Sequence, residues 1–281
     1  MRINTNVSSL TAQESTSQTN KNISSSLEKL SSGLRINKAA DDASGLAIAD
    51  KLRTQATSIN QGISNGTSAV ALLQIADKSM SEQSNILDTV KAKLIQANTA
   101  TTSADGRESI RKDINKLLTQ LDNIAKQTNY NGTYLLQESA TSTGTGLNLS
   151  FQVGETSSDT ITMTGIKANT GGLGLDNLLG LAADGLTSAL AASEQTTVDD
   201  AITTLNGYRG DIGSTQNQVE SAIRNLTTQA TNIKNAESTI RDVDYAAESA
   251  NYNKLNIIAQ AGSYAISQAN AAQQNVLRLL Q

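Results

Sequence analysis

The sequence predicts an all-α dominated fold, a long helical coiled-coil bundle with paired terminal helices and one small β-hairpin in the middle. The 281 residues include no Pro, so no proline ring interrupts a helix. Aromatic residues make up 2% of the chain, too few for a thick globular core, whereas aliphatic side chains suffice for seams between helices. Nine of the 19 glycines lie within residues 144–185, which leaves both ends of the chain suited to long helices.

Apolar residues recur with steps of three and four in four stretches of the chain. Such spacing gives each helix a narrow apolar stripe of the coiled-coil type. Four stripes in one chain predict helices that pack lengthwise. The stripes consist of Ile23, Leu27, Leu30 and Leu34; Met80, Leu87, Val90, Leu94 and Ala97; Ile110, Ile114, Leu117, Leu121 and Ile124; and Val219, Ile223, Leu226, Ala230 and Ile233.

The middle of the chain has the signals of strands and turns. Apolar and polar residues alternate over residues 147–164, and the turn-like segment 154–159 divides them, so this region is predicted to be a β-hairpin. Asn131–Gly132 favours a tight turn. Glycines predict a loop over residues 171–185, followed by a short helix over residues 186–193.

The two chain ends carry weaker apolar stripes, which favour helices that pair with each other. An amphipathic helix of this kind gains most of its stability from packing partners. We therefore expect both ends to be weakly folded in the monomer and to become ordered when neighbouring molecules cover their stripes.

Composition excludes several classes of function. The chain has no Cys and no His, which excludes disulfides, thiolate metal sites and imidazole catalysis. A net charge of −4 offers no basic face for nucleic acid, and no stretch approaches the ~18 apolar residues that span a membrane. The first residues lack the apolar segment of a secretory signal.

Two patterns that resemble catalytic motifs are better explained by helix structure. Residues 62–66 read Gly-Ile-Ser-Asn-Gly, like a nucleophile elbow, but no His is present to accept the proton. These glycines are expected to loosen a connection between two helices. The adjacent carboxylates Asp41–Asp42 and Asp199–Asp200 point in different directions on a helix and are expected in first helical turns. No enzyme activity, cofactor or metal is predicted.

Residues 30–53 read LSSGLRINKAADDASGLAIADKLR and closely resemble the N-terminal signature of the bacterial flagellins. The start (residues 2–6, RINTN) also fits, as does the end, with AGS at 261–263, QAN at 268–270 and QNVLRLL at 274–280. The similarity covers residues 1–136 and 197–281, in the order typical of the family. The short middle indicates an epsilon-type form without outer variable domains.

The resemblance implies a secreted subunit that polymerises into the extracellular flagellar filament and drives swimming. It implies export in the unfolded state by the flagellar type III apparatus, with an export chaperone, the filament cap and hook–filament junction proteins as partners. Residues 1–39 and 242–281 are expected to form an inner helical layer, and residues 40–241 an outer layer with no further domain. The residues expected to make the inner-layer assembly contacts are Ile3, Val7, Leu10, Ile23, Leu27, Leu30, Leu34, Leu255, Ile258, Ala265, Ala269, Val276 and Leu279.

The polar residues between the two layers have two open interpretations. In the family, this connector helps subunits adopt two slightly different packings, a role that would fall to Arg35, Asn37, Asp41 and Asp42. The alternative is plain helix capping by one of the two aspartates.

A receptor-binding segment of many flagellins resembles L-x-R-x-R-E-L-x-x-Q, which here corresponds to residues 87–96. This chain departs from that pattern at Thr89, Lys91, Ala92 and Lys93, which removes forked guanidinium contacts and a carboxylate. We therefore expect weak recognition by the host innate receptor.

Two other functions remain open. A hook–filament junction protein shares the two-ended architecture, although its terminal signatures are weaker. A secreted helical adhesin is the alternative from a different class, and it would not need paired terminal signatures.

Overall fold

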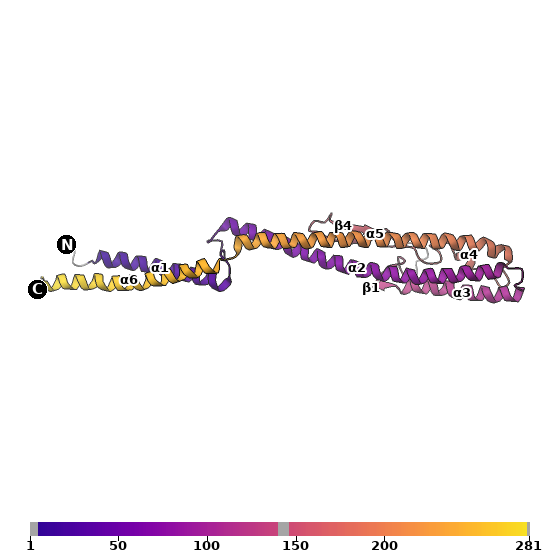
Figure 1. Ribbon diagram of the computed structural model, residues 1–281, viewed down its shortest axis with the longest axis horizontal. Helices are drawn as coiled ribbons and strands as arrows, with labels where there is room; N and C mark the ends of the chain where they lie inside the picture. The colour runs from indigo at the N-terminus through magenta and orange to yellow at the C-terminus, as the bar shows by residue number, and fades with distance from the viewer. Residues whose placement is uncertain (1–4, 140–145, 280–281) are drawn as a thin grey trace. The chain divides into compact units, whose positions relative to one another are not determined.

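The computed structural model describes residues 5–139 and 146–279, and helices dominate it as predicted (Figure 1). One compact unit contains the described residues up to Ala56 and from Thr231 onward, and the other spans Thr57–Ala230. The helices are α1 (Val7–Ser32), α2 (Ala43–Asn98), α3 (Ala104–Gln127), α4 (Asp176–Leu179), α5 (Ser188–Arg241) and α6 (Tyr245–Leu279). The strands are β1 (Asn129–Tyr130), β2 (Thr133–Tyr134), β3 (Leu149–Gln152) and β4 (Thr160–Met163).

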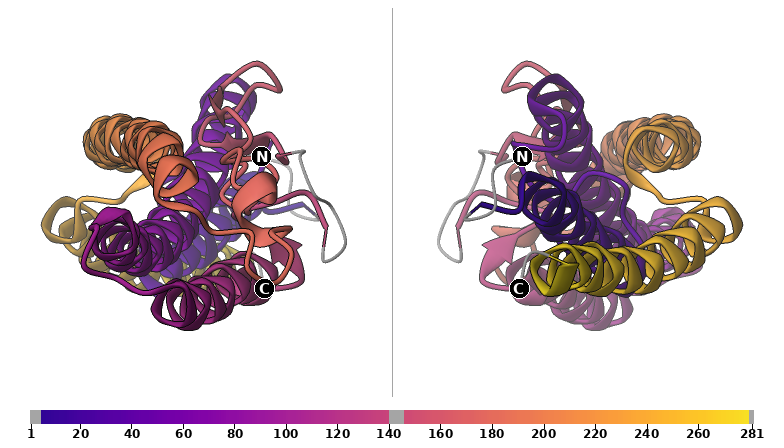
Figure 2. Two further views of the ribbon diagram at one scale, coloured as in Figure 1. Left: turned by 90° about the vertical axis from the view of Figure 1, so that its right-hand side faces the viewer. Right: turned by 90° about the vertical axis from the view of Figure 1, so that its left-hand side faces the viewer.

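In the first unit, the terminal helices α1 and α6 pack side by side in antiparallel directions (Figures 1 and 2). The side chain of Asn6 caps the start of α1 by accepting a hydrogen bond from the Ser9 N–H at 3.1 Å. The helix ends where Gly33 adopts a left-handed conformation with φ 74°, which a residue without Cβ tolerates.

In the second unit, α2 lies between α3 and α5 (Figures 1 and 2). Its predicted stripe from Met80 to Ala97 is fully buried in the main core, so this seam is confirmed as intramolecular. Ion pairs flank the seam on both sides: Lys93 contacts Asp113 of α3 at 2.8 Å, and Arg209 of α5 contacts Asp77 at 2.9 Å.

The apolar stripe of α3 is wider than predicted. Leu118 and Ala125 are fully buried, whereas the predicted Leu117 and Ile124 are only partly buried against the same core. The cause is a second partner, because the chain that returns from the hairpins also packs on α3. The buried amide of Gln83 marks this junction, since its Nε2 donates to the carbonyl of Leu121 in α3 at 3.2 Å and to that of Ala168 in the returning chain at 2.7 Å.

The predicted hairpin is confirmed as β3 paired with β4, with Phe151 opposite Ile161. A second, two-residue hairpin, β1–β2, has the predicted tight turn, in which Asn131 and Gly132 have φ values of 50° and 83°. Both positive angles are typical of a type I′ turn, which matches the twist of the strands.

Three local predictions were wrong. Residues 62–66 do not loosen a connection, because they lie inside the unbroken helix α2. The predicted short helix at 186–193 is the beginning of α5, which continues to Arg241. Asp199–Asp200 consequently lies in the interior of α5 rather than in a first turn, and Asp199 forms an ion pair with Lys91 of α2.

The glycines of the 62–66 segment have a packing role instead. A Cβ on Gly62 would lie 2.5 Å from the carbonyl oxygen of Val153, and a Cβ on Gly66 would lie 2.9 Å from the side chain of Ile223 in α5. Between them, Asn65 donates its amide to the carbonyl of Gln152 at 3.2 Å. The glycines therefore let the β3–β4 hairpin and α5 approach the backbone of α2 closely.

We predict that Gly62→Ala destabilises the free subunit by about 1–3 kcal/mol, because backbone cannot yield to the added methyl group. The matched control is Gly207→Ala in α5, where an added Cβ meets nothing within 4 Å. That control should raise stability by up to about 1 kcal/mol through helix propensity. Urea unfolding measures both, and equal stabilities of the two variants would contradict the packing role.

Candidate assembly site

The α1–α6 seam mixes aliphatic side chains such as Ile23 and Leu255 with small or polar ones, and several large apolar residues lie outside it. On α1, Thr16 and Thr19 are partly shielded, whereas the larger Val7 and Leu10 are 60% and 53% exposed. On α6, the large apolar residues Ile257 and Tyr264 are 66% and 73% exposed. An ordinary amphipathic helix pair buries most of its large apolar groups, so the exposed ones here are available to a neighbouring molecule.

The structure divides the predicted assembly residues between these two faces. Exposed residues point away from the helix partner, and half-buried ones lie in or beside the α1–α6 seam. Ile3 lies outside the described residues, and although Val276 and Leu279 belong to α6, their side chains are outside the described part. The exposed residues are Val7, Leu10, Leu27, Ile258 and Ala265, and the half-buried ones are Ile23, Leu30, Leu34, Leu255 and Ala269.

Sequence reasoning missed two exposed residues of α6, Ile257 and Tyr264, which are 66% and 73% exposed. It assigned one apolar stripe to the helix, but α6 has two, one against α1 and one outside. The signal was present, because no charged residue occurs between Leu255 and Leu277. A helix that faced solvent on one side would normally carry charges on that side.

The two chain segments that connect α1 and α6 to the rest of the chain hydrogen-bond to each other. Leu34 and Asp242 form an isolated antiparallel bridge. The Arg35 N–H donates to the Arg241 carbonyl at 2.6 Å, and the Val243 N–H donates to the Gly33 carbonyl at 3.0 Å.

The side chains of the two arginines add a reciprocal pair of contacts. The guanidinium of Arg35 donates to the Ile240 carbonyl on the other segment, and the Arg241 Nε donates to the Ile36 carbonyl at 3.3 Å. Each segment therefore holds the other through its backbone and through one arginine.

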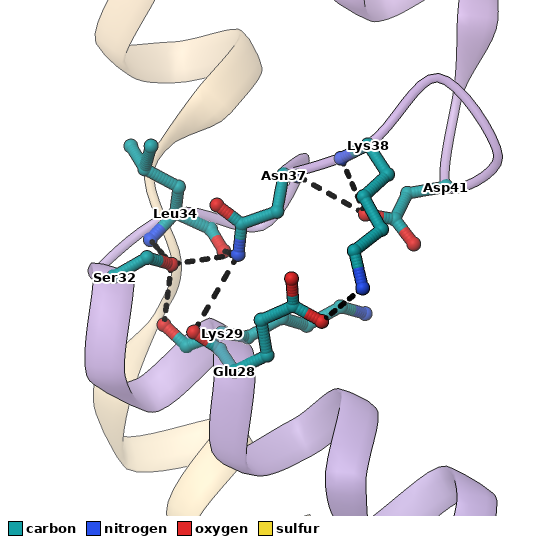
Figure 3. Close-up of polar contacts among 7 residues, drawn as sticks. All are labelled: Glu28, Lys29, Ser32, Leu34, Asn37, Lys38 and Asp41. Atoms are coloured by element: carbon teal, nitrogen blue, oxygen red, sulfur yellow. Dashed lines mark hydrogen bonds and ion pairs between the residues drawn. The ribbon is translucent and has the colours of Figure 1, made fainter.

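Figure 3 shows how the connector folds back onto the last turns of α1. The Asn37 amide donates to the Ser32 hydroxyl at 2.7 Å, and the Lys38 ammonium contacts the Glu28 carboxylate at 2.6 Å. Asp41 Oδ2 accepts the backbone N–H groups of both Asn37 and Lys38 at 3.0 Å. The three predicted residues Arg35, Asn37 and Asp41 thus lie in one hydrogen-bonded segment.

The electrostatics of this cluster follow from those contacts. The backbone N–H groups of Lys38 and Asn37 hold the pKa of the Asp41 carboxyl below its usual value. The hydrogen bond and the charge of Glu28 raise the pKa of Lys38. Asp42 acts differently, because its Oδ1 caps α2 by accepting the Gly45 N–H at 2.9 Å. The capping interpretation therefore describes Asp42, while Asp41 organises the preceding turn.

The residues of the predicted receptor segment lie on α2. Thr89 and Ala92 are exposed. Lys91 and Lys93 are half-buried and are held in ion pairs, with Asp199 of α5 and with Asp113 of α3 respectively. Their charges are directed along the protein surface toward neighbouring helices.

Two other kinds of site are absent from the described residues. No group of three or more Asp or Glu side chains in that part of the chain is arranged to hold a metal ion. No helix there combines the length and the apolar character that crossing a membrane requires.

Residues 3–141 match the family described as the bacterial flagellin N-terminal helical region, and residues 195–280 match the bacterial flagellin C-terminal helical region. The chain is 34% identical over 290 residues to the flagellar filament 33 kDa core protein of Treponema phagedenis, and both chains are fully covered. It is 35% identical over 309 residues to the flagellin of Bacillus subtilis (strain 168), again with both chains covered completely.

Among solved structures, a putative flagellar hook-associated protein from Vibrio parahaemolyticus is similar with a TM-score of 0.60. The match covers 72% of this chain and 100% of that chain at 11% identity, so it shows the fold alone.

We predict that acid loosens the connector through Asp41. Because the pKa of this carboxyl is lower in the folded chain, its stabilising contribution is complete above its unfolded value of about 4 and is lost as pH falls through the folded pKa. Amide hydrogen exchange at Asn37 and Lys38 should therefore accelerate about two- to fivefold in acid beyond its intrinsic pH dependence. In Asp41→Asn, the Asn37 and Lys38 amides should be less protected from exchange at pH 6. Their exchange should also lack the additional acceleration in acid, which we call the acid step.

Glu14→Gln, which removes one carboxylate from the exposed face of α1, is the control and should keep the acid step. An unchanged acid step in Asp41→Asn would contradict this role of Asp41.

Proposed function

The chain belongs to the bacterial flagellin family, and from this premise we propose how its parts build a filament. It is a structural subunit and not an enzyme, and it polymerises with copies of itself into the extracellular flagellar filament. We propose that residues 1–39 and 242–281 form the inner layer of that filament and that residues 40–241 form the outer layer.

The observation that carries this proposal is the exposed apolar face of the α1–α6 pair. In a free subunit, Val7, Leu10 and Leu27 of α1 and Ile257 and Tyr264 of α6 are each more than half exposed. Covering apolar surface with a neighbour gains about 25 cal/mol per Å². A self-contact that does not close on itself produces an open helical array, and this is the kind of contact that we propose for these residues.

The position of the connector supports the proposed layer boundaries. The bridge between Leu34 and Asp242 and the arginine contacts beside it lie where the terminal pair ends, close to the proposed boundaries at residues 39 and 242. The outer layer gains its stability from its own buried core, whereas the inner pair lacks one. Assembly therefore orders the inner layer most strongly.

Export in the unfolded state fits the same energetics. The chain has no disulfides to reduce and no prolyl bonds to isomerise, since Cys and Pro are absent. Exposed apolar helices also need cover before they reach their neighbours. An export chaperone, the filament cap and the hook–filament junction proteins are therefore the partners we propose for the terminal pair.

We predict that Ile257→Glu raises the critical concentration for seeded polymerisation at least about tenfold, because the contact would bury an unpaired charge. Gln260→Glu is the matched control, since it adds the same charge at an exposed polar position on the same helix. Sedimentation of filaments measures the critical concentration. Thermal unfolding should show both free subunits within about 0.5 kcal/mol of the wild type. Equal polymerisation of both variants would contradict the assembly face.

We further propose that host receptor recognition through α2 is weak. The forked guanidinium and the carboxylate of the receptor pattern are missing at Thr89 and Ala92, and ion pairs within the subunit hold Lys91 and Lys93. A receptor would have to break those pairs without gaining the geometry-specific contacts of an arginine.

We predict that the triple variant Thr89→Arg, Ala92→Glu and Lys93→Leu gains at least about tenfold potency in a receptor reporter-cell assay, because it restores a bidentate contact. Conversion of the exposed residues Asn85→Arg and Glu82→Gln on the same helix is the control and should leave the potency low. Full potency of the wild-type chain would refute the proposal.

A further inference from the structure

Beyond the connector contacts at one end, which include the Leu34–Asp242 bridge, the seam between α1 and α6 contains little that fixes how far one helix is displaced along the other. Its shielded positions repeat every seven residues, and many of them carry small or polar side chains, which pack almost equally well after a slip of one heptad. These positions are Ser9, Ala12, Thr16, Thr19, Ile23 and Ser26 on α1, and Tyr252, Leu255, Ala259, Gly262, Ile266, Ala269 and Gln273 on α6.

One partly buried polar contact interrupts this uniformity. The hydroxyl of Ser26, whose residue is 2% exposed, donates to Oε1 of Glu248 across the seam. The same oxygen accepts the Asn251 amide at 3.3 Å, and Lys29 lines the same notch. Each partner of this pair therefore depends on the other for a hydrogen bond that crosses the seam.

Two further contacts agree with the same register. At the far end of the pair, the Asn6 amide donates to the Ala269 carbonyl and to the Asn270 side chain, both at 3.1 Å. In the middle, Thr16 packs against Gly262 so closely that a Cβ on the glycine would lie 2.6 Å from the threonine hydroxyl oxygen.

We propose that the Ser26–Glu248 pair is a register lock for the terminal helices, supported at the other end by Asn6. A slip of one heptad in one direction places Ser26 opposite Leu255 and Glu248 opposite Gly33, so that both polar groups lose their partner. In the other direction, Ser26 passes the start of α6 at Tyr245 and loses its partner, whereas Glu248 comes to lie opposite Thr19. A buried polar group without a partner is costly, which is how a single polar residue selects one register in a coiled coil.

The register matters because it sets where the outer apolar residues lie. Val7, Leu10 and Leu27 of α1 keep fixed heights relative to Ile257 and Tyr264 of α6 only while the helices stay in one register. This consequence rests on the proposed function, since a filament repeats the same contact at every subunit. A slipped pair would present the same residues at the wrong spacing.

Engineered cysteines measure the register directly, because the chain has no Cys of its own. The in-register pair is Thr16→Cys with Gly262→Cys, since the Thr16 Cβ lies 3.7 Å from the position of a Cβ on Gly262. That separation falls within the range that a disulfide spans. The pair that reports a slip of one heptad is Thr16→Cys with Ala269→Cys.

Each cysteine pair is placed in the parent chain, in the unlocked variant Ser26→Ala with Glu248→Leu, and in the conservative variant Glu248→Gln. Oxidation and mass spectrometry of both the free subunit and the filament give the ratio of in-register to slipped disulfide. We expect at least about a tenfold excess of the in-register product in the parent and about a fivefold or greater fall of that ratio in the unlocked variant. Glu248→Gln, which keeps an acceptor oxygen, should retain the parent ratio.

The outcomes separate the two proposals. An unlocked variant with the parent ratio overturns the lock, and so does a parent chain that forms neither disulfide in the free subunit or the filament. A parent chain that forms the in-register disulfide but does not polymerise contradicts the proposed function and leaves the lock standing. Circular dichroism of the unlocked variant, which should remain helical, distinguishes slipping from unfolding.

Discussion

The structure depends on the contrast between what the terminal helices bury and what they expose. The α1–α6 seam contains Thr16, Gly262 and Ser26, while Leu10 and Tyr264 face outward. Because several of the largest apolar side chains lie outside the seam, the pair gains less from folding alone than it would by burying them. The larger gain becomes available only when a neighbouring subunit covers the outer residues. On the proposed assembly, the stability of the terminal pair therefore depends more on the filament than on the single molecule.

The second unit follows the opposite rule. Leu73, Leu87 and Leu94 of α2 are fully buried, and the returning chain covers α3 with further apolar side chains. This unit contains its own core and so retains its structure before and after assembly. The connector binds its two segments to each other through the reciprocal contacts of Arg35 and Arg241. Because each arginine donates to the opposite backbone, displacement of one segment must break contacts made by both.

Periodicity predicted the helices, the buried seam of α2 and the β3–β4 hairpin, because these features depend on local sequence spacing. It failed where a third element intervenes. Leu118 joins Leu117 in the α3 core because the returning chain also packs on α3, and a glycine occupies position 62 inside a helix because the hairpin backbone approaches it closely. The outward position of Ile257 was missed for a related reason, because a single apolar stripe per helix was assumed. Such contacts join residues far apart in the sequence, and the spacing of apolar residues within one helix cannot predict them.

A subunit that must travel before it assembles faces two requirements on the same helices. On the proposed export route, the terminal pair has to be easy to unfold, which favours a seam without large interlocking side chains. In the filament, it has to present one arrangement, which a seam of shielded positions repeated every seven residues does not specify by itself. A few polar contacts resolve this conflict, because a hydrogen bond such as that between Ser26 and Glu248 adds modest net stability and yet makes the slipped alternatives costly. On this proposal, the polar contacts fix the register of the helices, and the contacts between subunits supply most of the stability.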